Sequence, residues 1–118
     1  MGVLGLERTG LSVIKAVQQA GGLLICWDDD KHKRDNLTVD GVTVRDLNDK
    51  NIIRELDLLV VSPGVPHLYP EAHPVVTLAY KLNIRVDNDI GLFFLNHVQE
   101  EYEAFGDPPK IIAITGSN

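Results

Sequence analysis

The chain has 118 residues, of which 44% are hydrophobic and 24% are charged, proportions that are ordinary for a folded globular domain. Its 11 Lys and Arg residues against 17 Asp and Glu residues give a formal net charge of −6, which disfavours nucleic acid or an anionic membrane surface as a partner. The single cysteine, Cys26, excludes an internal disulfide, the pattern of the first residues predicts no signal peptide, and the apolar runs are too short to span a bilayer. Composition therefore predicts a soluble, cytoplasmic domain that is long enough to bury its own core.

Short apolar runs alternate with stretches of helical spacing along the chain. The apolar runs predict strands at 3–6, 23–27, 42–44, 58–61, 84–87 and 111–114. Helical spacing, capping residues and helix stops predict helices at 11–20, 31–36, 49–55, 71–82 (or from His73) and 89–98, with Asn48 or Asp49 and Asp89 as caps. This alternation predicts an α/β fold around a mostly parallel sheet. In such a sheet ligands bind beyond the carboxyl ends of the strands, so the loops after the strands matter most.

The first of these loops, Gly5-Leu6-Glu7-Arg8-Thr9-Gly10, has the spacing of the dinucleotide fingerprint G-x-G-x-x-G with Glu7 in place of the middle glycine. The first glycine of the fingerprint permits a tight turn, and the last permits close packing of helix on strand. Glu7 adds bulk and negative charge, so a pyrophosphate lying directly on this loop is disfavoured. The spacing alone is equally compatible with a packing turn that binds no ligand.

Two further loops carry groups suited to a nucleotide. The run Asp28–Asp30 ends the second predicted strand, where a carboxylate can accept from a ribose hydroxyl or a base N–H; the alternative is a solvated turn that caps the next helix. Ser62-Pro63-Gly64 follows a buried strand, and its hydroxyl and backbone N–H can hold phosphate oxygens; the alternative is a plain turn. The histidines and Cys26 lack metal-ligand spacing, so no metal site is predicted.

The last residues read as a second unit. Gly106–Pro109 is typical of a linker, and the pattern of Ile111–Asn118 predicts a buried strand that enters a glycine turn. This ending has the form of the first half of a variant P-loop, T-G-S-N-G-K-S-T, in which backbone N–H groups and a lysine hold phosphates. We therefore expect one domain over residues 1–107, and the linker, first strand and P-loop start of a truncated second domain over residues 108–118.

Taken together, four segments resemble the N-terminal domain of the MurD family of Mur ligases, which join D-glutamate to UDP-N-acetylmuramoyl-L-alanine. The resemblance rests on the order and spacing of Gly5–Ser12, Val61–Pro66, Asp89–Phe93 and Ile112–Asn118. It implies a Rossmann-like, mostly parallel five-stranded sheet with helices on both faces, which holds the UDP part of the substrate. It also implies a cytoplasmic parent enzyme of peptidoglycan precursor synthesis, and hence of cell-wall formation and cell division, that uses ATP and Mg²⁺ through an acyl phosphate.

The resemblance also implies roles for single residues. The expected UDP-binding residues are Arg8 and Thr9 beside the uracil, Asp28 and Asp29 at the end of the second strand, and Ser62 and Gly64 near the diphosphate. The expected start of the ATP-binding loop is Thr115, Gly116, Ser117 and Asn118, in the central domain of the parent. The expected partners are the UDP-linked sugar-peptide and the central and C-terminal domains. No catalytic residue and no bound cofactor is expected in this chain, which should be inactive by itself.

The chain departs from the family pattern at several positions. Glu7 and Asn88 stand where the family often has glycine, and Gly91 stands where it usually has glutamate. Asp29 and Asp30 replace residues that are often hydroxylic or basic, which is expected to weaken UDP binding. Glu7 fits better if the first loop faces a neutral base. The alternatives are an NAD- or flavin-binding module of an oxidoreductase, against which Glu7 counts, and a regulatory domain without a ligand.

Overall fold

The computed structural model describes residues 1–66, 71–92, 103–104 and 106. In this part of the chain one five-stranded sheet has the strand order β3-β2-β1-β4-β5, and every pair of neighbours is parallel. The strands are β1 (Gly2–Leu4), β2 (Ile25–Trp27), β3 (Thr43–Val44), β4 (Leu58–Val61) and β5 (Arg85–Asp87). The helices are α1 (Arg8–Gln19), α2 (Lys31–Asp35), α3 (Lys50–Ile53) and α4 (Pro74–Lys81). The predicted fold class is confirmed.

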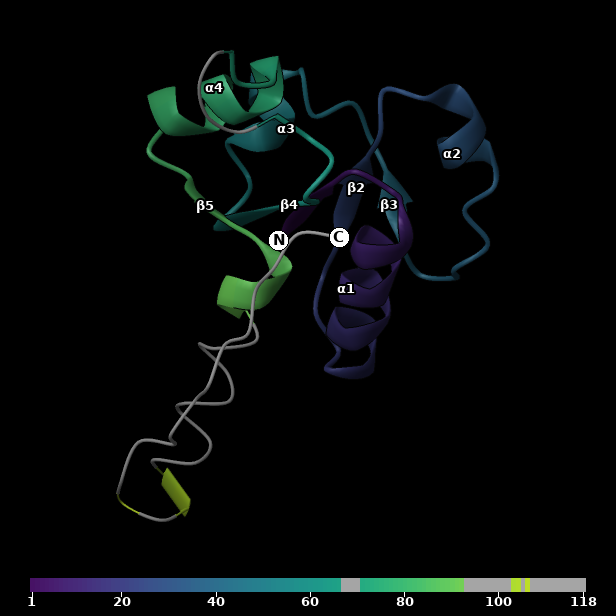
Figure 1. Cartoon of the computed structure of the whole chain (residues 1–118), viewed down its shortest axis with the longest axis vertical. Helices are drawn as coiled ribbons and strands as arrows, with labels where there is room; N and C mark the ends of the chain where they lie inside the picture. The colour runs from purple at the N-terminus through teal and green to yellow at the C-terminus, as the bar shows by residue number, and fades with distance from the viewer. Residues whose placement is uncertain (67–70, 93–102, 105, 107–118) are drawn as a thin grey trace, which may run out of the picture.

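Helices cover both faces of the sheet, so the central strands are buried on both sides (Figure 1). Along β1, Val3 packs into the core under α1, and the next residue, Leu4, packs into the core under α3 and α4. Strand β4 alternates in the same way, with Val60 on the α1 face. Cys26 is fully buried on that face, as expected of a core residue, and burial raises the pKa of its thiol to about 11.

Local signals account for most helix ends. Asp49 caps α3 by accepting from the Asn51 N–H, and His73 caps α4, whose first residue is Pro74. Helix α4 stops where Asn83 takes a positive φ of 56°, a conformation that asparagine tolerates. The predicted starts at Asp49 and His73 and the predicted stop at Asn83 are confirmed, whereas α3 ends at Ile53 rather than at the predicted residue 55.

Other boundaries differ from the sequence prediction. β1 ends at Leu4 because Gly5, with a φ of 96°, turns the chain. β2 begins at Ile25 rather than at Leu23, whose side chain is 91% exposed. α1 begins three residues earlier than expected, at Arg8.

The cap predicted for the helix after β5, Asp89, is wrong. The residues that the structure describes there, 89–92, are helical. Asn88 provides the cap instead of the predicted Asp89, because the Asn88 side chain accepts from the Gly91 N–H at 2.8 Å. A Cβ on Gly91 would lie 1.9 Å from Asp87 Oδ1, so a glutamate at this position would require the Asp87 carboxylate to move.

The rest of the predicted helix at 89–98, most of the linker and the predicted strand at 111–114 lie outside the described residues. The predicted division of the chain at residue 107 therefore stays a prediction. Within the described residues, no helix has the length and apolar character needed to cross a membrane.

Candidate functional site

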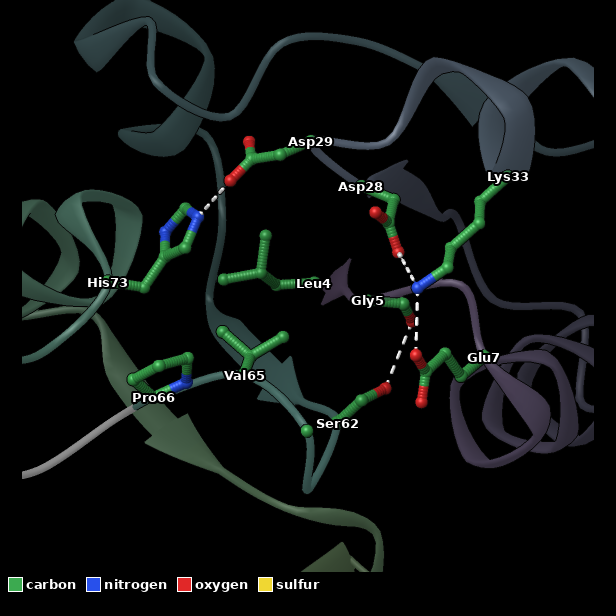
Figure 2. A pocket seen from close by; sticks show the side chains of 11 residues that line it. Leu4, Gly5, Glu7, Asp28, Asp29, Lys33, Ser62, Val65, Pro66 and His73 are labelled. Carbon is green, nitrogen blue, oxygen red and sulfur yellow. Dashed lines mark hydrogen bonds and ion pairs between the residues drawn. The ribbon is translucent and has the colours of Figure 1, made fainter.

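A cavity of about 210 Å³ lies beyond the carboxyl ends of β1, β2 and β4 (Figure 2). The strand order reverses between β1 and β4, and ligands of open α/β sheets bind at such a switch point. The lining combines apolar side chains with ionisable ones: Leu4, Gly5, Glu7, Asp28, Asp29, Lys33, Ser62, Gly64, Val65, Pro66 and His73. The cavity is therefore the principal candidate site in the described part of the chain.

The loop between β1 and α1 forms one wall of the cavity, and its two glycines behave as the fingerprint predicts. The Gly5 N–H donates to the Trp27 carbonyl at 2.9 Å, which holds the turn against the end of β2. A Cβ on Gly10 would lie 1.9 Å from the Gly5 carbonyl oxygen, so only glycine permits this approach of α1 to the turn. Gly10 is therefore required by packing, and Gly5 by its positive φ and its close approach to Ser62.

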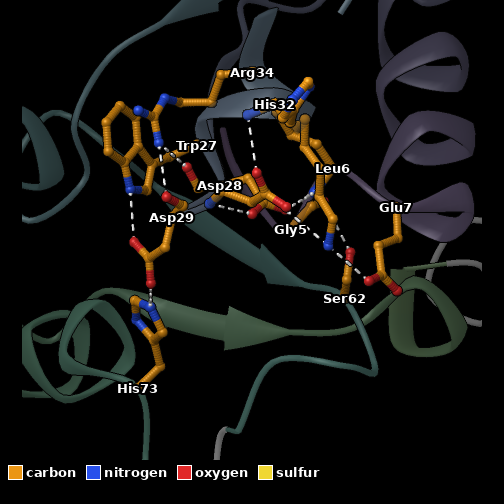
Figure 3. Close-up of polar contacts among 12 residues, drawn as sticks. Gly5, Leu6, Glu7, Trp27, Asp28, Asp29, His32, Arg34, Ser62 and His73 are labelled. Atoms are coloured by element: carbon orange, nitrogen blue, oxygen red, sulfur yellow. Dashed lines mark hydrogen bonds and ion pairs between the residues drawn. The ribbon is translucent and has the colours of Figure 1, made fainter. Parts of the chain in front are cut away.

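Asp28 joins the end of β2 to this loop. The residue is only 9% exposed; Oδ2 accepts from the Leu6 N–H at 2.8 Å, and Oδ1 accepts from the Asp30 N–H at 2.9 Å (Figure 3). Both carboxylate oxygens thus satisfy backbone donors. Asp28 therefore holds the loop between β1 and α1 in place and also lines the cavity.

Ser62 holds the same loop from the other side. Its hydroxyl is buried and donates to the Gly5 carbonyl at 3.0 Å, while its own N–H donates to the Leu4 carbonyl at 2.9 Å. The neighbouring Gly64 is exposed on the cavity surface. The Ser62–Gly64 turn is thus anchored at its first residue and accessible at its last.

Asp29 connects β2 to α4 across the cavity (Figure 3). Its carboxylate accepts from the Trp27 indole N–H at 3.0 Å and from His73 Nε2. His73 Nδ1 accepts from the Val75 N–H, so the ring proton lies on Nε2. The hydrogen bond from His73 is the main cause that lowers the pKa of the Asp29 carboxyl below its usual range, and the hydrogen bond from Trp27 contributes less. Asp29 is the exposed acceptor of this wall.

The lowered pKa of Asp29 predicts a pH dependence of stability. Because the folded pKa lies below the unfolded value near 3.8, the contribution of Asp29 is present above that value and is lost as pH falls through the folded pKa. Since the side chain is 60% exposed, we expect Asp29→Asn to reduce the free energy of unfolding by only about 0.5 kcal/mol at neutral pH. Urea unfolding of both proteins should show this difference shrink toward about pH 3; a difference that stays constant would contradict the assignment.

Lys33 and Glu7 form an ion pair at the cavity. Lys33 Nζ lies 2.8 Å from Glu7 Oε1 and 3.9 Å from Asp28 Oδ2, between the two carboxylates (Figure 2). The bond with Glu7 is the main cause that raises the pKa of Lys33. Among the described residues that line the cavity, Lys33 alone is a lysine or arginine, against three carboxylates.

The structure brings together Asp28, Asp29, Ser62 and Gly64, four of the residues predicted to bind UDP. Arg8 and Thr9 lie in the first turn of α1 and do not line the cavity. Their role in binding stays a prediction, as do those of the other residues. The residues predicted to begin the ATP-binding loop, Thr115, Gly116, Ser117 and Asn118, lie outside the described residues.

The sequence does not predict Lys33 and His73 as cavity residues, although both line the cavity. Lys33 belongs to no sequence motif, and Glu7, with which it forms an ion pair, lies 26 positions earlier in the chain. The sequence pattern indicates His73 only as a helix start without metal-ligand spacing, and the Asp29 that it contacts lies 44 positions earlier in the chain. Within the described residues, no group of three or more His, Cys, Asp or Glu side chains is placed to hold a metal ion.

The sheet order, the glycine loop and the position of the cavity define a Rossmann-like α/β domain with a candidate ligand site at its switch point. A solved structure agrees with this class: shikimate dehydrogenase from Aquifex aeolicus superposes with a TM-score of 0.60, covering 92% of this chain and 49% of that one. Its sequence identity is 13%, so the likeness shows the fold alone.

Sequence comparison is more specific. The chain is 43% identical over 116 residues to the UDP-N-acetylmuramoylalanine–D-glutamate ligase of Ruegeria pomeroyi, covering 98% of this chain and 25% of that protein. The enzymes of the same name from Roseobacter denitrificans and Cereibacter sphaeroides are 43% and 42% identical with the same coverage. The resemblance to the MurD family is thereby confirmed, and the chain spans about a quarter of the length of these curated relatives. No profile of a known protein family matches the chain.

Proposed function

We propose that this chain is the UDP-substrate-binding domain of an ATP-dependent ligase that adds D-glutamate to UDP-N-acetylmuramoyl-L-alanine in peptidoglycan precursor synthesis. The observation that carries the proposal is the identity of 43% over 98% of the chain to a ligase of that name. The position of the cavity at the switch point of a parallel sheet supports it, because nucleotides bind there in folds of this kind.

The size of the cavity supports a partial role in binding. Its volume of about 210 Å³ is below the range of roughly 300–1,000 Å³ that encloses a drug-sized ligand. A UDP-linked sugar-peptide is larger than such a ligand. The cavity therefore accommodates one end of that substrate, while the remainder extends away from the domain.

The chemistry of the lining suits a base or a ribose. Asp29 presents an exposed carboxylate that can accept from a base N–H or a ribose hydroxyl. Val65 and Pro66 supply apolar surface against which a planar ring can pack. We therefore place the uridine end of the substrate in the cavity.

The remaining functions belong to other parts of the proposed parent enzyme. Formation of an acyl phosphate needs metal-bridged phosphates and a cation that neutralises developing charge. We propose that ATP and Mg²⁺ bind chiefly to the central domain, that the chain alone binds substrate without turnover, and that the parent is a cytoplasmic enzyme of cell-wall synthesis.

A thermal-shift experiment separates the proposed function from its alternatives. The melting temperature of the chain is measured with UDP, with NAD and with neither. A ligand at ten times its dissociation constant stabilises the folded state by about 1.4 kcal/mol, which raises Tm by several degrees in a domain of this size. We expect UDP to raise Tm and NAD to leave it unchanged. Stabilisation by NAD alone would favour an oxidoreductase module, and stabilisation by neither would favour a regulatory domain.

A further inference from the structure

Glu7 occupies an unusual place in the cavity. It is the N-cap residue of α1, yet its side chain accepts no hydrogen bond from the first turn of that helix. Instead, its Oε1 accepts from Lys33 on α2 at 2.8 Å. Its Oε2 lies 3.5 Å from the position that a Cβ on Gly64 would take. The Glu7 carboxylate thus extends between α2 and the turn that follows β4.

This position coincides with the groups that a phosphate would use. In a fingerprint loop, the N-terminus of the first helix and the backbone at the middle glycine approach a pyrophosphate. In this chain the Ser62–Gly64 turn is the second group that was expected to hold phosphate oxygens. The Glu7 carboxylate lies at the N-terminus of α1 and beside the Ser62–Gly64 turn. Its negative charge therefore occupies the place where the negative charge of a phosphate would bind.

The surrounding charges reinforce this effect. Asp28 and Asp29 add two carboxylates to the lining, and Lys33 adds one ammonium group. That ammonium is engaged by Glu7 and lies 3.9 Å from Asp28 Oδ2, so its charge is already balanced. A diphosphate placed in the cavity would meet more negative than positive charge, whereas a neutral base or ribose would not.

From this geometry we infer that Glu7, held by Lys33, is a specificity-determining residue that admits the uncharged end of a nucleotide to the cavity and excludes phosphate from it. The inference rests on the proposed function in one respect, because it assigns the uridine end of UDP to the cavity and sends the diphosphate outward. Its core, the exclusion of phosphate by Glu7, is independent of which nucleotide binds.

The test compares the 118-residue chain with Glu7→Gln, which keeps the shape of the side chain and removes its charge. Because Glu7 is 59% exposed, this variant is expected to fold normally. Calorimetric titration with inorganic pyrophosphate, UDP and uridine should show that affinity for pyrophosphate and UDP rises about tenfold in the variant, the scale of one like-charge contact, while affinity for uridine is unchanged.

A matched control removes the same charge elsewhere. Glu55 is exposed and precedes β4, so it lies at the amino-terminal end of the strand, whereas the cavity lies beyond the carboxyl end. Glu55→Gln should therefore leave all affinities unchanged. Adding Lys33→Met to Glu7→Gln should reduce the gain, because the ammonium that Glu7→Gln frees would no longer attract phosphate.

The outcomes are distinct from those of the proposed function. Equal affinities in wild type and Glu7→Gln, or equal gains in Glu7→Gln and Glu55→Gln, would overturn the inference. Weaker UDP binding in Glu7→Gln would also overturn it, since Glu7 would then contact the ligand favourably. A gain for pyrophosphate without any binding of uridine or UDP to the wild type would sustain the inference and contradict the proposed function.

Discussion

Gly10→Ala is expected to destabilise the chain by about 3 kcal/mol, the upper end of what overpacking costs. The added methyl group would lie 1.9 Å from the Gly5 carbonyl oxygen, which is backbone and cannot rotate away. The Ser62 hydroxyl oxygen, 3.0 Å away, closes the same space. Alanine gains about 1 kcal/mol over glycine in helix propensity, which offsets only part of this cost. Urea unfolding of both proteins measures the difference.

Gly64→Ala is the matched control for this substitution. The nearest atom to its added methyl group is Glu7 Oε2 at 3.5 Å, an ordinary contact, so we expect a change within about 0.5 kcal/mol. If Gly10→Ala were no more destabilising than Gly64→Ala, helix α1 would not be held against the Gly5 turn as closely as the structure shows.

Asp28→Ala is expected to cost about 2–3 kcal/mol in the free energy of unfolding. It removes the acceptors of two backbone N–H groups, and that of Leu6 is buried. Asp28→Asn should cost less, because one amide oxygen still accepts. Stability is measured without ligand, since Asp28 is also a predicted UDP-binding residue.

Asp35→Ala serves as the control for Asp28. Asp35 is an exposed helix residue whose ion pair with Lys31 follows i,i+4 spacing, so its loss should cost about 0.5 kcal/mol or less. Equal effects of the two substitutions would show that the Asp28 carboxylate does not anchor the loop.

The layered architecture could be predicted from the sequence because it depends on patterns that are local. Apolar runs such as 58–61 and helical spacing at 11–20 specify which segments are strands and helices. Alternation of the two then restricts the sheet to parallel strands with crossovers. The ends of elements are less determined: Leu23 is apolar, but it lies before the first paired residue of β2, Ile25, and is exposed.

The site could be predicted only in part, for a related reason. The loops at strand ends were identifiable, and Asp28, Asp29, Ser62 and Gly64 do line one cavity. The sequence could not show that Asp28 and Ser62 use their polar atoms on the loop itself, because this depends on which backbone groups the turn at Gly5 leaves to be satisfied. The reach of Lys33 depends on how α2 is oriented, which no local pattern specifies.

The central claim is that the cavity beyond β1, β2 and β4 binds the uridine end of a UDP-linked substrate. Amide chemical-shift mapping of the chain during titration with UDP tests it most directly. The account predicts that the amides of Gly5, Asp29 and Gly64 shift in a saturable way, while those of Gly21 and Gly22, beyond the far end of α1, do not. Unchanged signals around the cavity at millimolar UDP, or shifts confined to other parts of the chain, would contradict it.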